Sequence, residues 1–261
     1  MSEPRLPPLR PEPIPLGALP SRALAIYRAH PVMFPLIALV TALPVGAFSI
    51  AAALAYPERS DRGDAVLAAI LQIVPVALIF PISAVAATVA TIAIVNGRRP
   101  SIGAAFEPVG ERFWPLAAVL VIYTAAVIAG WLAFILPGVF ALVAWLFASR
   151  AVVVERLPVR GAFLRSWELV RGAWWRTLAG FLVVEILANI AIFAVLQLVG
   201  LGTHDLSRTP ETVTNGAAAI IITSLVLPFE MIGVTLLYLD RRVRLEGRWP
   251  APVQAAPSLP A

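Results

Sequence analysis

Two glutamates and one asparagine in apolar surroundings are the residues of this chain best suited to chemistry. Glu185 and Glu230 each lie near the middle of a long apolar segment, and Asn189 follows Glu185 by one helical turn, on the same face. A charge at the centre of a bilayer costs about 2.5–3.5 kcal/mol or more, so a carboxylate there indicates a function or a stabilising partner. The three side chains could bind a proton, a cation or a substrate amine in a transporter-like cavity. Alternatively, each glutamate is protonated or hydrogen bonded and only holds helices together.

Arginines that border the central apolar segments form a second candidate site. Guanidinium groups match the oxygens of a phosphate, so these side chains could contact lipid headgroups. The alternative is that they only anchor the chain on one face of the membrane. No arginine is expected at the depth of Glu185 or Glu230, and the sequence therefore predicts no buried ion pair. The candidate lipid-phosphate contacts are Arg150, Arg156, Arg165, Arg171 and Arg176.

The residues that the common catalytic sites require are missing. The sequence has no cysteine, which excludes disulfides, thiolate nucleophiles and cysteine metal ligands. Its two histidines, His30 and His204, lie on opposite predicted sides of the membrane, without acidic residues at metal-binding spacing. No Ser/His/Asp set, phosphate-cradling glycine loop or nucleic-acid module is recognisable. We therefore expect no enzyme activity, no cofactor, no metal and no nucleic-acid partner.

The composition indicates that the elements positioning these residues lie in a bilayer. The chain is 60% hydrophobic and 13% charged, whereas a soluble domain is about 45–50% apolar and about 25% charged. A helix of about 20 apolar residues crosses a hydrocarbon layer of about 30 Å. The sequence therefore predicts an all-α polytopic membrane protein. Its six transmembrane helices are expected at about 31–56, 65–96, 114–135, 139–154, 173–201 and 217–239.

Three amphipathic segments predict interfacial helices on the membrane surface. They cover 17–30, 101–113 and 158–172, and each precedes two of the predicted spans. The membrane domain, 17–246, could therefore consist of three units of a surface helix and a hairpin. The alternative is that interfacial aromatic residues give any multi-span protein this appearance. The expected connections are polar loops at 57–64 and 202–215 and a tight turn at Leu136-Pro137-Gly138.

The distribution of arginine predicts how the chain is oriented. All twenty basic residues are arginines; seventeen fall on the side that holds both termini and three on the other. The positive-inside rule then predicts cytoplasmic N- and C-termini. The bias toward alanine and arginine suggests a bacterial origin, and hence the inner membrane. Residues 1–16 and 247–261 are rich in proline and are predicted to be disordered cytoplasmic tails.

Several short motifs are grouped in the second half of the chain, at 136–138, 150–155, 161–163, 165–172, 174–177 and 236–247. They resemble the membrane domain found with some bacterial glycerophosphoryl diester phosphodiesterases, over about 130–247 and more loosely over 17–130. The resemblance implies a membrane architecture. It does not carry over the hydrolase activity, because the metal-binding carboxylates and histidines of that family's soluble catalytic barrel have no counterpart in this sequence.

Two functions remain open. The first is a non-catalytic integral membrane module that organises phospholipid, including anionic phospholipid, or a partner membrane protein such as an enzyme, through its arginine-rich surface helices. The second is a small transporter or lipid-moving protein that works through Glu185, Asn189 and Glu230. A polar cleft that reaches both glutamates would favour the second function, and glutamates sealed by packed side chains would favour the first. An integral membrane hydrolase is disfavoured by the missing nucleophile and metal ligands.

Overall fold

The computed structural model describes residues 11–55, 62–203 and 208–250. Over these residues the chain is helical and contains no strand. Six stretches are long and apolar enough to cross a membrane: Met33–Leu54, Leu78–Val95, Phe113–Ala133, Ile135–Val154, Trp174–Val199 and Pro210–Glu246. The protein is therefore an all-α polytopic membrane protein, as its composition predicts.

Short helices alternate with long hairpins along the chain. The short helices are α1 (Leu19–Ala29, preceded by the 3-10 turn Leu16–Ala18), α4 (Ile102–Glu111) and α8 (Val159–Val170), which confirms the three predicted amphipathic helices. A hairpin follows each of them. The hairpins are α2 (Met33–Ala55) with α3 (Arg62–Val95), α5 (Phe113–Ala133) with α6 (Ile135–Ala144) and α7 (Ala148–Val154), and α9 (Trp174–Thr203) with α10 (Arg208–Glu246).

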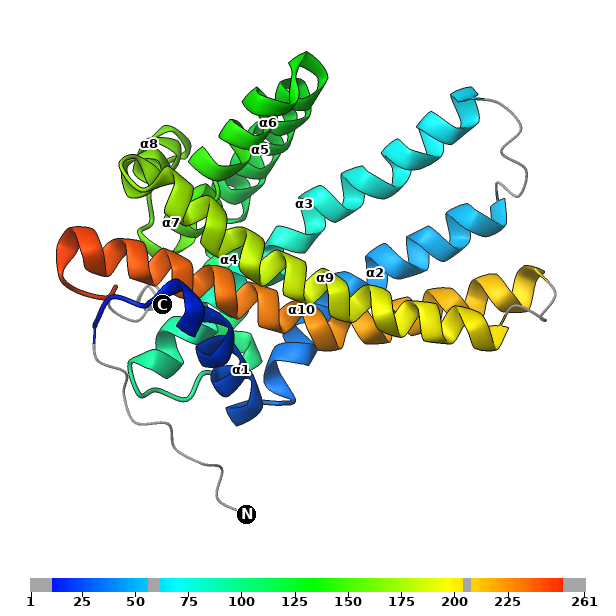
Figure 1. The fold of residues 1–261 in the computed structure, drawn as a ribbon, viewed down its shortest axis with the longest axis horizontal. Coiled ribbons are helices and arrows are strands. Elements are labelled where there is room, and N and C mark those ends of the chain that lie inside the picture. The colour runs from blue at the N-terminus through cyan, green and yellow to red at the C-terminus, as the bar shows by residue number, and fades with distance from the viewer. Residues whose placement is uncertain (1–10, 56–61, 204–207, 251–261) are drawn as a thin grey trace, which may run out of the picture.

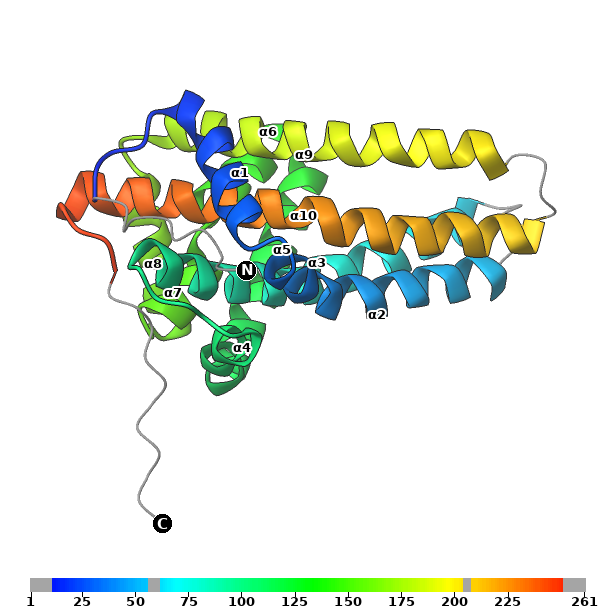
Figure 2. The same ribbon diagram turned by 90° about the horizontal axis from the view of Figure 1, so that it is seen from below.

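The three hairpins extend from a common base, which is formed by α1, α4, α7 and α8 (Figure 1). Helix α10 is the central element, because it packs along α2 on one side and along α9 on the other (Figure 2). The α5–α6 hairpin turns away from the other two (Figure 1). Large side chains that are fully buried near this base include Phe147, at the N-cap of α7, Leu169 of α8 and Tyr238 of α10. The core therefore sits at the base, and the arms of the hairpins leave apolar side chains for lipid.

Glycines allow α10 to approach both of its neighbours closely. Gly46 of α2 faces Ile220 of α10, and a Cβ atom at Gly46 would collide with that isoleucine. On the other side, a Cβ atom at Gly233 of α10 would lie 2.6 Å from Val184 of α9. Small residues at helix crossings permit the van der Waals packing that associates helices in lipid. The close crossings fix α10 between α2 and α9.

The turn between α5 and α6 differs from its prediction. The sequence places a turn at Leu136-Pro137-Gly138, but only Phe134 leaves the helical conformation, with φ −173° and ψ 156°. Pro137 is tolerated in the first turn of α6, where N–H groups have no partner within the helix. A Cβ atom at Gly138 would lie 2.8 Å from the ring of Trp131. The glycine therefore serves the close crossing of α5 and α6 and not a turn.

The polar connections are shorter than predicted. Residues 62–64 already belong to α3, residues 202–203 belong to α9, and residues 208–215 belong to α10. The helices thus continue through residues at the end of the first predicted loop and at both ends of the second. The rest of these loops, 57–61 and 204–207 with His204, lies outside the described residues.

The predicted tails are partly ordered where the structure describes them. Ile14 is only 1% exposed, and its N–H group donates to Asp240 (2.7 Å). Trp249 packs against the core from the other end of the chain. The prediction of disorder is therefore wrong around Ile14 and Trp249, because tertiary contacts hold these proline-rich segments. Residues 1–10 and 251–261 lie outside the described part of the chain.

Candidate functional site

A cavity of about 440 Å³ lies between α2, α9 and α10 and reaches all three intramembrane candidates. Glu185 and Asn189 line it from α9, and Glu230 lines it from α10. Its size falls within the range of about 300–1,000 Å³ that is typical of small-molecule sites. The other side-chain polar groups on its walls are the hydroxyls of Thr41, Ser49 and Thr223. The structure therefore brings Glu230 to the side chains that the sequence already places on one face of α9.

Glu185 has one satisfied and one unsatisfied carboxyl oxygen. The Asn189 Nδ2 atom donates to Glu185 Oε1 (3.2 Å) and to the Glu185 carbonyl (2.9 Å). Glu185 Oε2 is buried and has no hydrogen-bond partner within the described ranges. The Glu230 carboxyl group lies close enough to interact with that of Glu185. Because a buried polar atom without a partner costs about 1–3 kcal/mol, this oxygen is suited to accept a hydrogen bond from a ligand.

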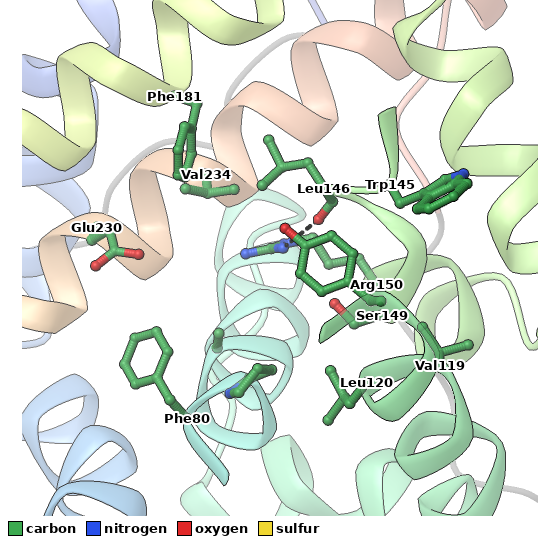
Figure 3. Close-up of a pocket in the computed structure, with 13 residues that line it drawn as sticks. Phe80, Val119, Leu120, Trp145, Leu146, Ser149, Arg150, Phe181, Glu230 and Val234 are labelled. Carbon is green, nitrogen blue, oxygen red and sulfur yellow. Dashed lines mark hydrogen bonds between the residues drawn. The ribbon is translucent and has the colours of Figure 1, made fainter. Parts of the chain in front are cut away.

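A second, smaller cavity of about 150 Å³ shares wall residues with the first. Figure 3 shows the residues that line it. Phe80 and Glu230 line both cavities, so Glu230 lies on the wall between them. Arg150 enters the smaller cavity from α7, and Tyr123 and Ser149 also line it. The smaller cavity therefore has a guanidinium group and a carboxyl group on its walls.

Arg150 does not lie at the surface, where the sequence predicts a lipid-phosphate contact. Its exposed fraction is only 6%. The Nη1 atom donates to the Leu146 carbonyl (3.2 Å), whereas Nε is buried without a partner among the residues described. Arg150 interacts electrostatically with Glu230, but no direct ion pair joins the two in the described structure. The prediction that no arginine reaches the level of Glu230 is therefore wrong, because Arg150 is buried in the protein and lines the same cavity as Glu230.

A break in the fourth span explains the position of Arg150. The sequence predicts one helix at 139–154, but α6 ends at Ala144 before α7 begins. Ser166 of α8 satisfies the interrupted backbone: its hydroxyl donates to the Ala144 carbonyl (2.9 Å) and accepts from the Phe147 N–H group (3.1 Å). Irregular backbone at membrane depth is tolerated where it is buried in protein or lines a cavity. The break separates α7 from α6 and aims Arg150 into the cavity.

At the base, in contrast, charged residues contact each other directly. Glu155 accepts from Arg165 Nε (2.8 Å) and from the Tyr238 hydroxyl (2.7 Å). Arg165 also contacts Glu246, which accepts from Arg242 Nη2 (2.7 Å). Burial is the largest single influence and lowers the pKa of the Arg165 guanidinium, but the Glu155 charge and the hydrogen bonds to Glu168 and Glu155 together outweigh it, so the pKa is raised. Arg165, a predicted lipid contact, is therefore a structural residue that joins α8 to α7 and α10.

Asp240 centres a second cluster of paired charges at the base. It is 1% exposed and accepts from the Ile14 N–H group (2.7 Å) and from Arg244 Nε (2.9 Å). Arg176 Nη2 lies 3.3 Å from Asp240 Oδ2 and also donates to the Ile14 carbonyl (2.7 Å). Arg176 therefore joins the N-terminal segment, α9 and α10.

The remaining predicted lipid contacts lie on the outer side of the base. Arg156 pairs with Glu111 of α4 (2.8 Å). Arg171 is exposed at the end of α8, and its side chain makes no ion pair with any described residue. Trp167 and Trp175 are exposed nearby, at 38% and 77%. Of the five arginines predicted to contact lipid, Arg171 is the one whose side chain has no bonded partner among the described residues. Its contact with lipid stays a prediction.

The sequence contains little that could have revealed the smaller cavity. Ser149 and Arg150 follow an apolar run, as residues at the end of a span do, and the break before them depends on a hydroxyl from another helix. Ser166 itself resembles any small residue on an amphipathic helix. Within the described ranges no group of three His, Cys, Asp or Glu could hold a metal ion. The side chains on the cavity walls can bind charged and hydrogen-bonding groups.

The three hairpins, the broken fourth span and the polar cavities define a multi-span helical membrane protein with an intramembrane polar site. Residues 113–241 match a family described as a domain of unknown function, DUF7847. This range includes Arg150, Glu185, Asn189 and Glu230. No curated protein and no solved structure matches the chain. The family description makes no mention of a phosphodiesterase, and that resemblance stays a prediction.

Proposed function

We propose that the protein is a membrane-embedded carrier, without catalytic activity of its own, that binds an amine-bearing solute between α2, α9 and α10. The observation that carries this proposal is the cavity of about 440 Å³ on which Glu185, Asn189 and Glu230 converge. Ionisable side chains within transmembrane segments usually face a bundle interior or a water-filled cavity and mark the pathways of substrates and ions.

The hydrogen-bonding groups on the cavity walls match those of a primary ammonium group. An ammonium group has three donors and no acceptor. Glu185 Oε2 lacks a donor among the described residues, and the Asn189 amide uses its nitrogen on Glu185, which leaves its oxygen to accept. Glu230 adds a third acceptor on the wall of the cavity. An amine would therefore satisfy acceptors that the described chain leaves open.

The broken fourth span also supports a carrier. In many secondary transporters, interrupted transmembrane helices form the substrate site near the midplane of the bilayer. Here the break between α6 and α7 directs Arg150 to the cavity next to the glutamates. A protein that only anchors in the membrane has no need of such a break, because a continuous helix would span the bilayer equally well.

The experiment that tests this proposal compares an amine with an alcohol of equal chain length. Hexylamine and hexanol are titrated calorimetrically into the purified protein in lipid nanodiscs. We expect hexylamine to bind about tenfold tighter or more, since a hydrogen bond to a charged group contributes about 1.5–3 kcal/mol. The double variant Glu185→Gln/Glu230→Gln should lose this preference, whereas Glu168→Gln, on the exposed side of α8, should keep it. Equal binding of both compounds by the unmodified protein would refute the carrier.

A second candidate function is the membrane-surface module, and the exposed side of α8 favours it. Leu164 and Trp167 are exposed there beside Arg160 and Arg171. Native mass spectrometry can measure the anionic phospholipid that remains bound after purification. The module predicts less bound lipid in Arg160→Gln/Arg171→Gln than in the control Arg99→Gln, in which an exposed arginine elsewhere is neutralised. Equal lipid content would count against the module and leave the carrier untouched.

We further propose that the chain lies in a bacterial inner membrane with both termini cytoplasmic, and that it is related to the membrane domain found with glycerophosphoryl diester phosphodiesterases. The one-sided distribution of arginine supports the orientation. Because the natural chain contains no cysteine, an Arg160→Cys variant can be labelled at a single thiol. A membrane-impermeant maleimide should label it in inside-out vesicles but not in intact cells. Labelling in intact cells would overturn the orientation.

A further inference from the structure

We infer that the ligand of the two adjoining cavities is a zwitterion, in which an anionic group binds Arg150 and an ammonium group binds Glu230 and Glu185. This inference rests on the proposed carrier function and deepens it by naming the chemical class of the solute. An amine alone would use only the carboxylate side of the site. The anionic group would lie in the smaller cavity beside Arg150, and the ammonium group would lie at Glu230, on the wall shared with the larger cavity that Glu185 lines.

The anion-binding side of the site is Arg150. It is more than nine-tenths buried, and its Nε atom has no hydrogen-bond partner among the described residues. Only the Leu146 carbonyl accepts from the guanidinium group in the described chain. The Tyr123 hydroxyl, bonded to the Leu142 carbonyl (3.3 Å), and Ser149 lie on the same cavity wall. A carboxylate or phosphate would give the guanidinium group the bidentate acceptor that suits it.

The cation-binding side is the glutamate pair. Glu185 Oε2 is a buried acceptor without a hydrogen-bond donor in the described structure, as Arg150 Nε is a buried donor without an acceptor. Glu230 connects it to Arg150, because Glu230 lines both cavities. Arg150 Nε in the smaller cavity and Glu185 Oε2 at the larger one therefore lack hydrogen-bond partners among the described residues, and Glu230 lines both cavities. A molecule with both an anionic and an ammonium group satisfies both.

The separation of Arg150 from Glu230 distinguishes this site from the charge clusters at the base. At the base, Arg165 and Glu155 approach to 2.8 Å, and Arg244 and Asp240 to 2.9 Å. Arg150 and Glu230 interact electrostatically across the cavity, yet no ion pair joins them in the described structure. Figure 3 shows both side chains extending toward the same space from different helices. That space is where a ligand with two opposite charges would lie.

The ammonium and anionic groups could belong to a free amino acid or to a lipid headgroup. Phe80, Trp145, Leu146 and Phe181 line the smaller cavity and provide apolar surface for a hydrocarbon portion in either case. The experiment therefore includes both sources. The soluble probes are ω-amino acids of two to six carbons, each with its parent amine, and the lipid probe is a lysophosphatidylethanolamine, with phosphoethanolamine as its soluble headgroup.

Binding to the full-length protein in nanodiscs is measured for each pair of probes. We expect at least one ω-amino acid, or the phosphoethanolamine group, to bind about tenfold tighter or more than the amine of equal length. Arg150→Met should remove this advantage while amine binding persists, and Arg150→Lys should retain part of it. Arg99→Met, at an exposed arginine outside both cavities, is the matched control and should behave as the unmodified protein. Thermal unfolding of each variant reports whether it is folded.

The outcomes separate this inference from the proposed function. If the amines bind and no zwitterion binds better, the zwitterion site is overturned while the carrier stands. If a folded Arg150→Met protein keeps the full zwitterion advantage, Arg150 is not the anion site. If neither amines nor zwitterions bind, the carrier itself fails. The ligand series is first measured on the unmodified protein, so the inference can be refuted even if the Arg150→Met variant fails to fold. Tighter binding of the lysolipid than of phosphoethanolamine would identify a lipid as the source.

Discussion

The base and the cavities contain the same kinds of charged residues in opposite arrangements. At the base, Glu155, Asp240 and Glu246 each contact at least one arginine directly. In the cavities, Arg150 and Glu230 face each other without contact among the described residues, and Glu185 keeps an open acceptor. Charges that contact each other stabilise the fold, whereas charges held apart cost stability and are available to a ligand. The two regions therefore differ in the distances between their charged groups and not in the types of charged residue that they contain.

The largest loss of stability is expected at the base, from Asp240→Ala. Removal of this carboxylate leaves Arg176, Arg244 and the Ile14 N–H group without their common acceptor. Loss of one partner of a buried ion pair costs about 3 kcal/mol or more. Thermal unfolding in detergent should show the lower midpoint, and Asp240→Asn, which keeps one acceptor oxygen, should lose less. An Asp240→Ala protein that melts like the unmodified one would contradict the structural role of the base.

The next largest effect is expected from Ser166→Ala. The substitution leaves the Phe147 N–H group and the Ala144 carbonyl unpaired at the break in the fourth span. A buried polar group without a partner costs about 1–3 kcal/mol. Ser149→Ala is the matched control, because the Ser149 side chain lines the cavity and makes no hydrogen bond across the break in the described structure. Equal melting of the two variants would show that the break does not depend on Ser166.

A smaller change in stability is expected from Glu230→Gln. No ion pair is lost in the described structure, and the new amide is nearly the same size as the carboxyl group, so the unfolding free energy should change by less than about 1 kcal/mol. Ligand binding should change much more, because the substitution removes a carboxyl group from the wall shared by both cavities. Calorimetric titration with hexylamine, beside thermal unfolding, measures both. Strong destabilisation with unchanged hexylamine binding would show that Glu230 stabilises the fold, as the charged residues at the base do, and does not bind the ligand.

The smallest effect is expected from Glu168→Gln. The Glu168 side chain is 54% exposed and pairs with Arg165 (3.1 Å) on the surface of α8. Exposed pairs of this kind contribute about 0–1 kcal/mol, so its melting temperature should scarcely move. A loss as large as that of Asp240→Ala would mean that the outer side of α8 is covered by something other than lipid or water.

The features that depend on local sequence were predictable, and those that depend on distant contacts were not. Apolar runs and clustered arginines predict the order of three surface helices and six spans. Asn189 and Glu185 are one turn apart, so their shared face could be derived from helical geometry. The meeting of Glu185 with Glu230 requires the packing of α9 on α10. The buried position of Arg150 requires a hydroxyl from α8, and no local pattern encodes it.

The bond from Ser166 into the fourth span has a mechanical consequence. Helix α8 lies at the base, yet one of its hydroxyls holds the two ends of an interrupted helix whose second part bears Arg150. A tilt of α8, caused by lipid composition or by a docked protein, would pull on this junction and shift the guanidinium group relative to Glu230. Events at the periphery of the molecule would in this way be transmitted to the interior by a single side chain.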